Sequence, residues 1–533
     1  MPFAEMARTI FSRLPVWLVI LAIGLPTIAS VWFGISAGGG STWEHILQNR
    51  LLPYTLNTLS VLIMTAILIL VFALPSAWLI SLYEFPGRKL FEWALILPLA
   101  VPGYVMAYAW ADLAGVAGPV QSALREMTGW SARDYWFPDI FTAGGLSFIL
   151  ASTLFPYVYI TARAAFSSQS LAQLEAAKGL GVSGLRLFWF VALPTARLAI
   201  TAGLALALME AAADYGAADF LGIQTLGVGI VRSWSSYSEP ASAARLALVL
   251  ISIAFLFLLV SRVAQGKAGT QRTSKRWLSP TRTELSHKTR WFATSLCTTI
   301  LLVAFFLPVA RLIWLLLEQG RGTAPLLPPL MSSLILGAGG TLLALCCALI
   351  ISLWSARLSR LNRLGRLVMT AGYAIPGVVL GLGGLFVLKA TGQALTGFVA
   401  IGLLIWVYAT RFTAAGTEPL AAAKAAAPRS LDEASRSLGT SHWRKFFTVD
   451  LQIVRPGILA ASLILFVETI KELPATLMLS PNGWDTLAVR AHAYATDERL
   501  AEATLPSLLI TLAGLIPVLI LSWRLSKSGY TVE

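Results

Sequence analysis

Long apolar runs recur along this 533-residue chain, and they constrain its fold more than any other feature. A helix needs about 20 mainly apolar residues to cross the hydrocarbon layer of a membrane. Only 12% of the residues are charged and 57% are hydrophobic, which excludes a series of soluble domains. We therefore expect an all-α polytopic membrane protein with twelve transmembrane helices. The expected spans lie near 16–36, 56–82, 90–113, 143–162, 190–213, 242–261, 291–316, 331–355, 367–388, 396–410, 456–478 and 505–523.

The basic residues predict how these spans are oriented. The chain has 40 Lys and Arg residues against 26 Asp and Glu, and most of the basic ones fall in alternate loops. Because cytoplasmic loops carry an excess of Lys and Arg, we expect both termini to face the cytoplasm. The tenth span, placed at 396–410, leaves Arg411 in the cytoplasmic loop that follows it. No zinc-finger spacing or basic stripe interleaved with aromatics is present, so no nucleic-acid partner is expected.

One segment of the sequence occurs twice. Residues 175–194 read EAAKGLGVSGLRLFWFVALP, and residues 433–452 read EASRSLGTSHWRKFFTVDLQ. Both copies have Glu-Ala, a Gly six positions after the Glu, and a Val and a Leu ten and twelve positions after that Gly. The charge count places both copies on the cytoplasmic side. There, each would form a short helix and turn that fits a groove on a soluble partner.

The repeat predicts the division of the chain. We expect a first six-helix repeat over residues 1–262, a basic cytoplasmic linker over 263–290, and a second six-helix repeat over 291–533. The two halves then have the same orientation, with a pseudo-twofold axis along the membrane normal. A pathway between two such halves is typical of a transporter or a channel.

The repeated segment resembles the "EAA" loop of binding-protein-dependent ABC importer permeases. The first copy fits over its full spacing, whereas Ser435 replaces an Ala in the second. The resemblance implies that two cytoplasmic ABC ATPase subunits dock on the loops near 171–186 and 429–445. It also implies a periplasmic solute-binding protein and a place in the bacterial inner membrane, in contact with lipid. The implied coupling residues are Glu175, Ala176, Ala177, Gly181, Glu433, Ala434 and Gly439.

Two further stretches, 208–234 and 466–494, look like the fused permeases of ferric-iron importers. This resemblance implies import of ferric iron by alternating access, with ATP and Mg bound by the partner subunits and no cofactor bound by this chain. Thiamine, phosphonate or polyamine import by the same machinery stays open, and so does an ion-gradient-driven secondary transporter. Measuring uptake after separate loss of the gradient and of ATP discriminates between these energy sources.

Acidic residues recur within the expected spans, where an ionised side chain costs about 2.5–3.5 kcal/mol. Glu210 and Glu468 occupy matching positions, and Asp214 and Glu472 follow one helical turn later. Carboxylate oxygens suit a hard cation such as Fe³⁺, so these acids are candidates for the outer part of the pathway. The alternative is a structural role in ion pairs, for which Lys471 is close in sequence. No metal ligands are assigned.

Pro-Gly pairs recur as well, in Val101-Pro102-Gly103 and Ile375-Pro376-Gly377. In membrane helices such pairs mark kinks, and here they predict either close helix packing or hinges for alternating access. The sequence contains no G-x-x-x-x-G-K-[ST] phosphate loop, and its spans hold no clustered catalytic set. We therefore expect a transport subunit without an ATPase site of its own, and not a membrane-embedded enzyme.

Overall fold

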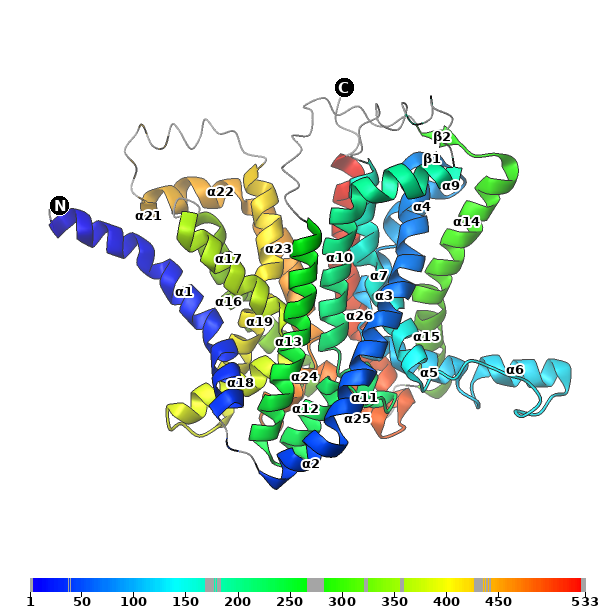
Figure 1. The fold of residues 1–533 in the computed structure, drawn as a ribbon, viewed down its shortest axis with the longest axis horizontal. Coiled ribbons are helices and arrows are strands. Elements are labelled where there is room, and N and C mark those ends of the chain that lie inside the picture. The colour runs from blue at the N-terminus through cyan, green and yellow to red at the C-terminus, as the bar shows by residue number, and fades with distance from the viewer. Residues whose placement is uncertain are drawn as a thin grey trace. The chain divides into compact units, whose positions relative to one another are not determined.

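The computed structural model of the chain is almost entirely helical (Figure 1). Two short strands, β1 (Tyr83–Glu84) and β2 (Thr283–Glu284), form one parallel pair. The structure describes residues 3–36, 38, 40–167, 177, 179, 184–265, 282–320, 325–354, 359–425, 435, 437, 440 and 442–528.

The chain forms two compact units, and each draws on both halves of the sequence. Unit 1 comprises Met1–Leu52, Leu226–Ile251 and Thr323–Tyr494. Unit 2 comprises Pro53–Thr225, Ser252–Gly322 and Ala495–Glu533. The repeat boundaries expected at 262 and 291 divide the chain in sequence, whereas each compact unit combines segments from both halves. The boundaries therefore stay predictions.

Unit 1 is built around the helices of the second half. Its elements are α1 (Phe3–Ser36), α2 (Ser41–Asn49), α12 (Leu226–Ser235), the first part of α13 (Pro240–Gln265), α16 (Leu327–Leu349), η4 (Ile350–Trp354), α17 (Ser359–Ala374), α18 (Gly377–Ala390), α19 (Gly397–Ala425), α21 (His442–Lys445), η6 (Phe446–Asp450), α22 (Leu451–Ile453), α23 (Arg455–Ile470), α24 (Pro474–Leu479) and most of α25 (Leu487–Thr496).

Unit 2 is built around the helices of the first half. Its elements are α3 (Leu51–Leu82), β1, α4 (Arg88–Ala94), η1 (Leu97–Ala100), α5 (Gly103–Ala114), α6 (Pro119–Thr128), α7 (Ala143–Ser167), α9 (Gly184–Leu187), η2 (Phe188–Ala192), α10 (Leu193–Ala213), α11 (Gly216–Phe220), β2, α14 (His287–Leu301), η3 (Leu302–Phe306), α15 (Leu307–Gln319) and α26 (Leu500–Ser528).

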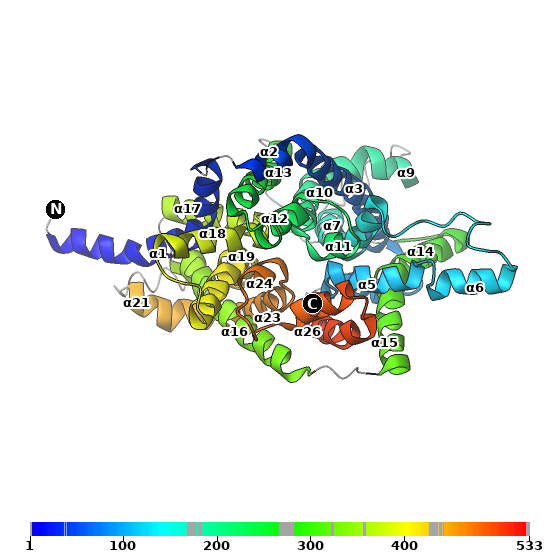
Figure 2. The same ribbon diagram turned by 90° about the horizontal axis from the view of Figure 1, so that it is seen from below.

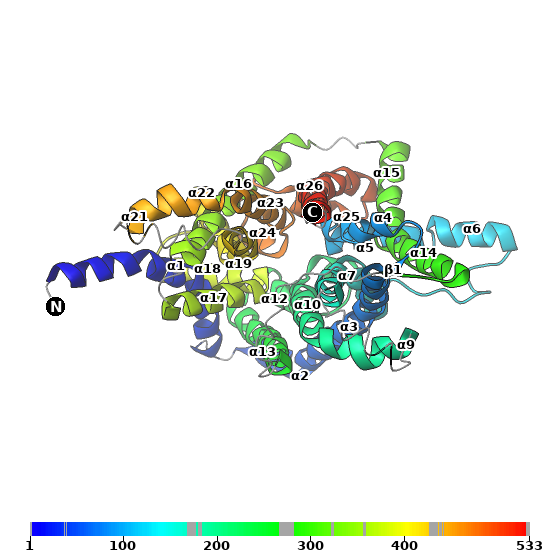
Figure 3. The ribbon, with the colours of Figure 1, turned by 90° about the horizontal axis from the view of Figure 1, so that it is seen from above.

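The first and last long helices of the chain pack with helices that are distant in sequence. Helix α1 lies against α17 and α18 (Figure 3), and the Ser30 hydroxyl donates a 2.7 Å hydrogen bond to the carbonyl of Val379. Helix α26 contacts η1 and α15, and α14 contacts α4. Side chains of α1 such as Val16 and Ile23 enter the apolar core of unit 1 beside Met369.

The described residues contain nine helices that are long and apolar enough to cross a membrane. Three further pairs of helices meet the same test as bent spans, which brings the total to as many as twelve. All twelve expected spans overlap these helices or pairs, so the all-α polytopic fold is confirmed. The tenth span is longer than expected, because α19 continues to Ala425 and takes in Arg411.

Two of the bent spans break at the Pro-Gly pairs. The axis turns by 97° where Pro102 separates η1 from α5, and by 111° where Pro376 separates α17 from α18. Both prolines are extended, with ψ of 147° and 143°, and each precedes the first residue of the next helix. Proline fixes φ and disfavours a helical conformation in the residue before it, so the break falls at this point in both copies.

Candidate functional site

In unit 2 the broken span meets the carboxylate of Asp214. Asp214 ends α10, and its Oδ1 accepts hydrogen bonds from the backbone N–H groups of Ala217 and Ala218, at 3.1 and 3.2 Å. Its Oδ2 lies beside Gly103, the first residue of α5, where an added Cβ would approach it to 3.1 Å. The partial positive charge at a helix N-terminus favours a carboxylate at such a position. Asp214 therefore caps the start of α11 and lies close to the start of α5.

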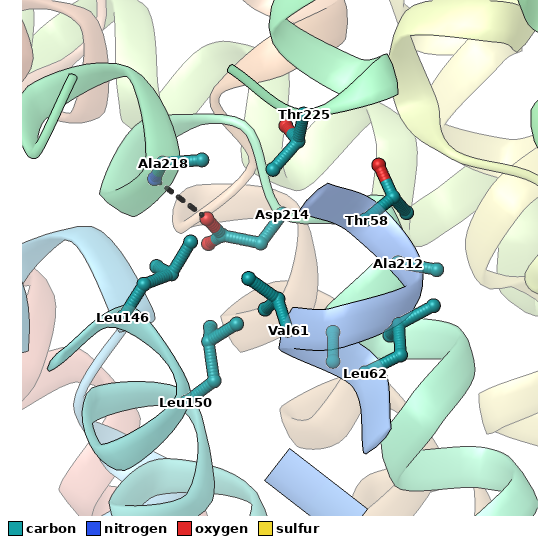
Figure 4. A pocket seen from close by; sticks show the side chains of 10 residues that line it. Thr58, Val61, Leu62, Leu146, Leu150, Ala212, Asp214, Ala218 and Thr225 are labelled. Atoms are coloured by element: carbon teal, nitrogen blue, oxygen red, sulfur yellow. Dashed lines mark hydrogen bonds between the residues drawn. The ribbon is translucent and has the colours of Figure 1, made fainter. Parts of the chain in front are cut away.

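Asp214 also borders a small pocket whose free volume, about 10 Å³, holds one water molecule at most (Figure 4). The hydroxyl-bearing side chains of Thr58 and Thr225 line it together with apolar residues such as Val61 and Leu150. The pocket thus places a carboxylate and two hydroxyl groups among apolar side chains, and it is too small for a solvated cargo ion.

Unit 1 repeats the arrangement with Glu472. Its Oε1 accepts a hydrogen bond from the N–H of Ala475 and its Oε2 from that of Thr476, at 3.1 and 3.2 Å. Glu472 therefore holds the start of α24, as Asp214 holds the start of α11. The Gly377 backbone lies against both this carboxylate and Arg411. A Cβ added to Gly377 would collide with Oε1 of Glu472 and would lie 2.6 Å from Nη1 of Arg411. Only glycine fits at this position without displacing its neighbours.

In unit 1 an arginine pairs with the acid at the start of α24. Nη1 of Arg411 lies 3.2 Å from Oε1 of Glu472, and the two side chains are only 8% and 1% exposed. The Tyr408 hydroxyl lies 2.6 Å from that of Thr476, which donates to Oε2 of Glu472 at 3.0 Å. The arginine position corresponds to Thr153 in the first half. The sequence analysis placed Arg411 in a loop. The apolar run around Arg411, 61 residues before an acid expected within a span, is the sequence feature that could have indicated a buried ion pair.

The other two acids predicted for the pathway lie one turn earlier. Glu468 is paired with Lys471 at 2.8 Å, on side chains that are 14% and 20% exposed. This is the structural pairing that the sequence left open. Glu210 is half-buried in the last turn of α10, where the residue corresponding to Lys471 is Ala213. Contact between any of these acids and cargo stays a prediction.

A further ion pair lies in the same part of unit 2. Arg311 of α15 donates through Nε to Oδ2 of Asp112, which lies near the end of α5. Within the described part of the chain, no three His, Cys, Asp or Glu side chains gather closely enough to form a metal-binding group.

The flanks of the two predicted coupling loops share one backbone design. A single-turn π-helical segment follows each loop, η2 at Phe188–Ala192 and η6 at Phe446–Asp450, at the 258-residue spacing of the sequence repeat. Single turns of π-helix are frequently found at functional sites. The repeat seen in sequence is therefore also a repeat in structure.

Most of the predicted coupling residues lie outside the described residues: Glu175, Ala176, Gly181, Glu433, Ala434 and Gly439. Ala177 is described, and it is helical and buried, as is Ser435 at the matching position of the second copy. Two residues further on, Gly179 and Ser437 are helical and exposed. At these positions both copies have the same helix phase, with one side turned inward and one turned to solvent.

The described residues that flank the two loops make different contacts. In unit 2 the Trp78 ring lies 5.5 Å from Phe166, which precedes the loop, and 5.4 Å from Phe188, which follows it. In unit 1 a buried ion pair follows the loop, with Nζ of Lys445 3.6 Å from Oδ1 of Asp450. The residues at the same positions of the first copy, Leu187 and Ala192, are buried and apolar, so the two copies differ here in charge.

The sequence matches the family described as the binding-protein-dependent transport system inner membrane component, twice, over residues 76–267 and 340–525. It is 26% identical over 527 residues to the Fe(3+)-transport system permease protein FbpB 2 of Haemophilus influenzae, covering 96% of this chain and 98% of that protein. It is also 26% identical to the sulfate transport system permease protein CysT of Escherichia coli, over 47% of this chain and 90% of that protein.

The CysW sulfate permease of Synechocystis is 25% identical over 50% of this chain and 96% of its own length. Single permeases of this kind thus match about half of the chain, in keeping with the two family matches. With its two repeats and its bent spans, the chain belongs to the binding-protein-dependent inner membrane components, the membrane permease subunits of ABC importers.

Proposed function

We propose that this permease imports ferric iron delivered by a periplasmic binding protein, by alternating access driven by two separate ATPase subunits. The observation that supports ferric iron as the cargo is the similarity to an Fe(3+)-transport permease along 96% of the chain. The sulfate permeases match only about half of it. ATP and Mg bind to the partner subunits, both termini face the cytoplasm, and the loops near 171–186 and 429–445 receive the ATPases.

The repeated structure supports coupling through these loops. A π-helical turn follows each loop and leads to a long helix, directly to α10 in unit 2 and, in unit 1, through α22 and a bend of 70° to α23. Each long helix ends close to an acid that lies beside the glycine of a Pro-Gly pair, Asp214 in unit 2 and Glu472 in unit 1. A displacement of a loop by an ATPase therefore has a short covalent route to the broken span.

The test is reconstitution of the chain in lipid vesicles with the ATPase and binding protein encoded beside it. ATP hydrolysis is measured with the binding protein empty, loaded with Fe³⁺, or replaced by a sulfate-loaded sulfate-binding protein. We expect stimulation by the iron-loaded protein alone. Stimulation by the sulfate-loaded protein would refute iron as the cargo, and uptake that follows an ion gradient without ATP would refute the ABC mechanism.

The coupling loops are tested in the same vesicles by Glu175→Ala and Glu433→Ala. Each should reduce the copurification of the ATPase and its stimulated hydrolysis, because the resemblance places these acids in the docking loops. The matched control is Glu44→Ala, an exposed acid in α2, distant in sequence from either loop. Unchanged ATPase binding in the combined Glu175→Ala and Glu433→Ala variant would contradict docking through these loops.

A further inference from the structure

Helix α6 is an amphipathic helix whose apolar side is left open. It follows α5 after a four-residue turn and extends away from it (Figures 2 and 3), and it runs crosswise to α14 (Figure 1). Val120 and Met127, seven residues apart on one side of the helix, are 45% and 86% exposed. A spacing of seven residues places side chains on the same helical face.

The polar side of α6 is the one that the protein covers. Gln121 donates through Nε2 to the Ala114 carbonyl at 2.8 Å, and its Oε1 accepts a hydrogen bond of 2.8 Å from the Tyr135 hydroxyl. Arg125 donates to that hydroxyl at 3.0 Å and to the carbonyl of Val116 at 2.8 Å. The loop after α6 thus packs on the polar side and leaves the apolar side bare. This is the reverse of what exposure to water alone favours.

Exposed apolar side chains also lie on α15, a helix of unit 2 that packs against α5. Asp112, near the end of α5, is paired with Arg311 of α15, so the end of α5 that leads to α6 lies beside α15. There Trp314 and Leu317 are 61% and 78% exposed, as expected for side chains that face lipid. Helix α6 precedes α7 in the chain, whereas the predicted coupling loop follows α7. Because α7 is long and apolar enough to cross a membrane, α6 and the loop are expected on opposite sides of it.

Two tryptophans in the following loop are also exposed. Trp130 stacks on the Tyr135 ring at 6.1 Å and is 48% exposed, and Trp136 is 85% exposed. Tryptophan is enriched at the boundary between hydrocarbon and water, where its ring and its N–H are both accommodated. Helix α6 itself carries one Arg and one Glu, so attraction to anionic lipid is not needed to hold it there.

We propose that α6 lies in the lipid boundary of the leaflet opposite the coupling loops, with Val120 and Met127 among the glycerol and upper acyl groups. In this position it anchors the end of α5, the second half of a broken span. This inference does not depend on the cargo. The occupant of the apolar face is phospholipid, and a docked binding protein is the rival outcome.

The test uses nitroxide labels on the full chain in phosphatidylcholine nanodiscs, with the native cysteines replaced by alanine. Labels are placed at Val120→Cys and Met127→Cys, and at the adjacent polar position Glu126→Cys as the matched control. Circular dichroism and gel filtration of each variant confirm the fold. We expect labels 120 and 127 to favour oxygen over a water-soluble nickel reagent, at a depth of about 5–10 Å, and label 126 to show the opposite preference.

Equal nickel accessibility at 126 and 127 would overturn the proposal. So would labels 120 and 127 that become shielded from nickel only when the loaded binding protein is added, because the face would then be a protein docking surface. Neither result bears on the proposed import of iron, which the ATPase measurements test separately.

Discussion

Removing the guanidinium of Arg411 should destabilise unit 1 more than any ordinary surface substitution. In Arg411→Met the Glu472 carboxylate, 1% exposed, keeps its helix-capping bonds but loses the positive charge 3.2 Å away. At an effective dielectric constant near 20, two charges at this distance interact by about 5 kcal/mol. Truncating one partner of a buried pair costs about 3–5 kcal/mol, because the other charge stays buried. We expect a loss of that size in the free energy of unfolding.

The double variant Arg411→Met/Glu472→Gln separates the uncompensated charge from the lost packing. Because it leaves no buried charge, its cost should be about 1–3 kcal/mol below the sum of the single costs. Unfolding is followed by circular dichroism in mixed micelles of increasing dodecyl sulfate content. Arg366→Met, an exposed position on α17, is the control and should change stability by less than about 0.5 kcal/mol. A cost for Arg411→Met below about 1 kcal/mol, or strict additivity, would refute the reasoning.

Three further predictions concern the Gly377 backbone, the ion pair that follows the second loop, and the two acids that lie one turn before Asp214 and Glu472. Gly377→Ala should lower thermal stability, because its Cβ would lie 2.6 Å from the Arg411 guanidinium, and uptake should fall with it. Lys445→Leu alone should destabilise the protein by leaving Asp450 buried without its partner, whereas Lys445→Leu/Asp450→Ala, which restores the apolar residues of the first repeat, should cost little in a thermal unfolding scan. Alanine at Glu210 and Glu468 should reduce uptake in vesicles while ATPase copurification stays unchanged.

A control or a contradicting outcome accompanies each of these predictions. Gly381→Ala should be tolerated, since an added Cβ there meets only ordinary contacts, the nearest being Sδ of Met478 at 3.7 Å. A Gly381→Ala variant as unstable as Gly377→Ala would remove the steric explanation. If the Lys445 single and double variants lose equal stability, the buried charge is not the cause. Full uptake by the variant without Glu210 and Glu468 would remove these acids from the pathway.

The sequence predicted the spans well, because an apolar run long enough to cross a membrane has few other uses. It failed at Arg411, since hydropathy does not distinguish an arginine that ends a span from one buried against an acid 61 residues away. The Pro-Gly pairs located both breaks, but the turns of 97° and 111° depend on what packs against each half-helix. The roles of Asp214 and Glu472 as caps also required geometry, because their backbone donors are invisible in a residue pattern.

The membership of α1 in unit 1 has a consequence for how the chain is made. Helix α1 leaves the ribosome long before the helices it packs on, α17 and α18, which begin at Ser359. During most of synthesis it must therefore reside in lipid on its own hydrophobicity, without its native neighbours. If the two halves of the sequence were translated separately, unit 1 would have to obtain α1 from the first fragment and unit 2 would have to obtain α26 from the second. Complementation between such fragments should therefore require both to be inserted in the same bilayer at the same time.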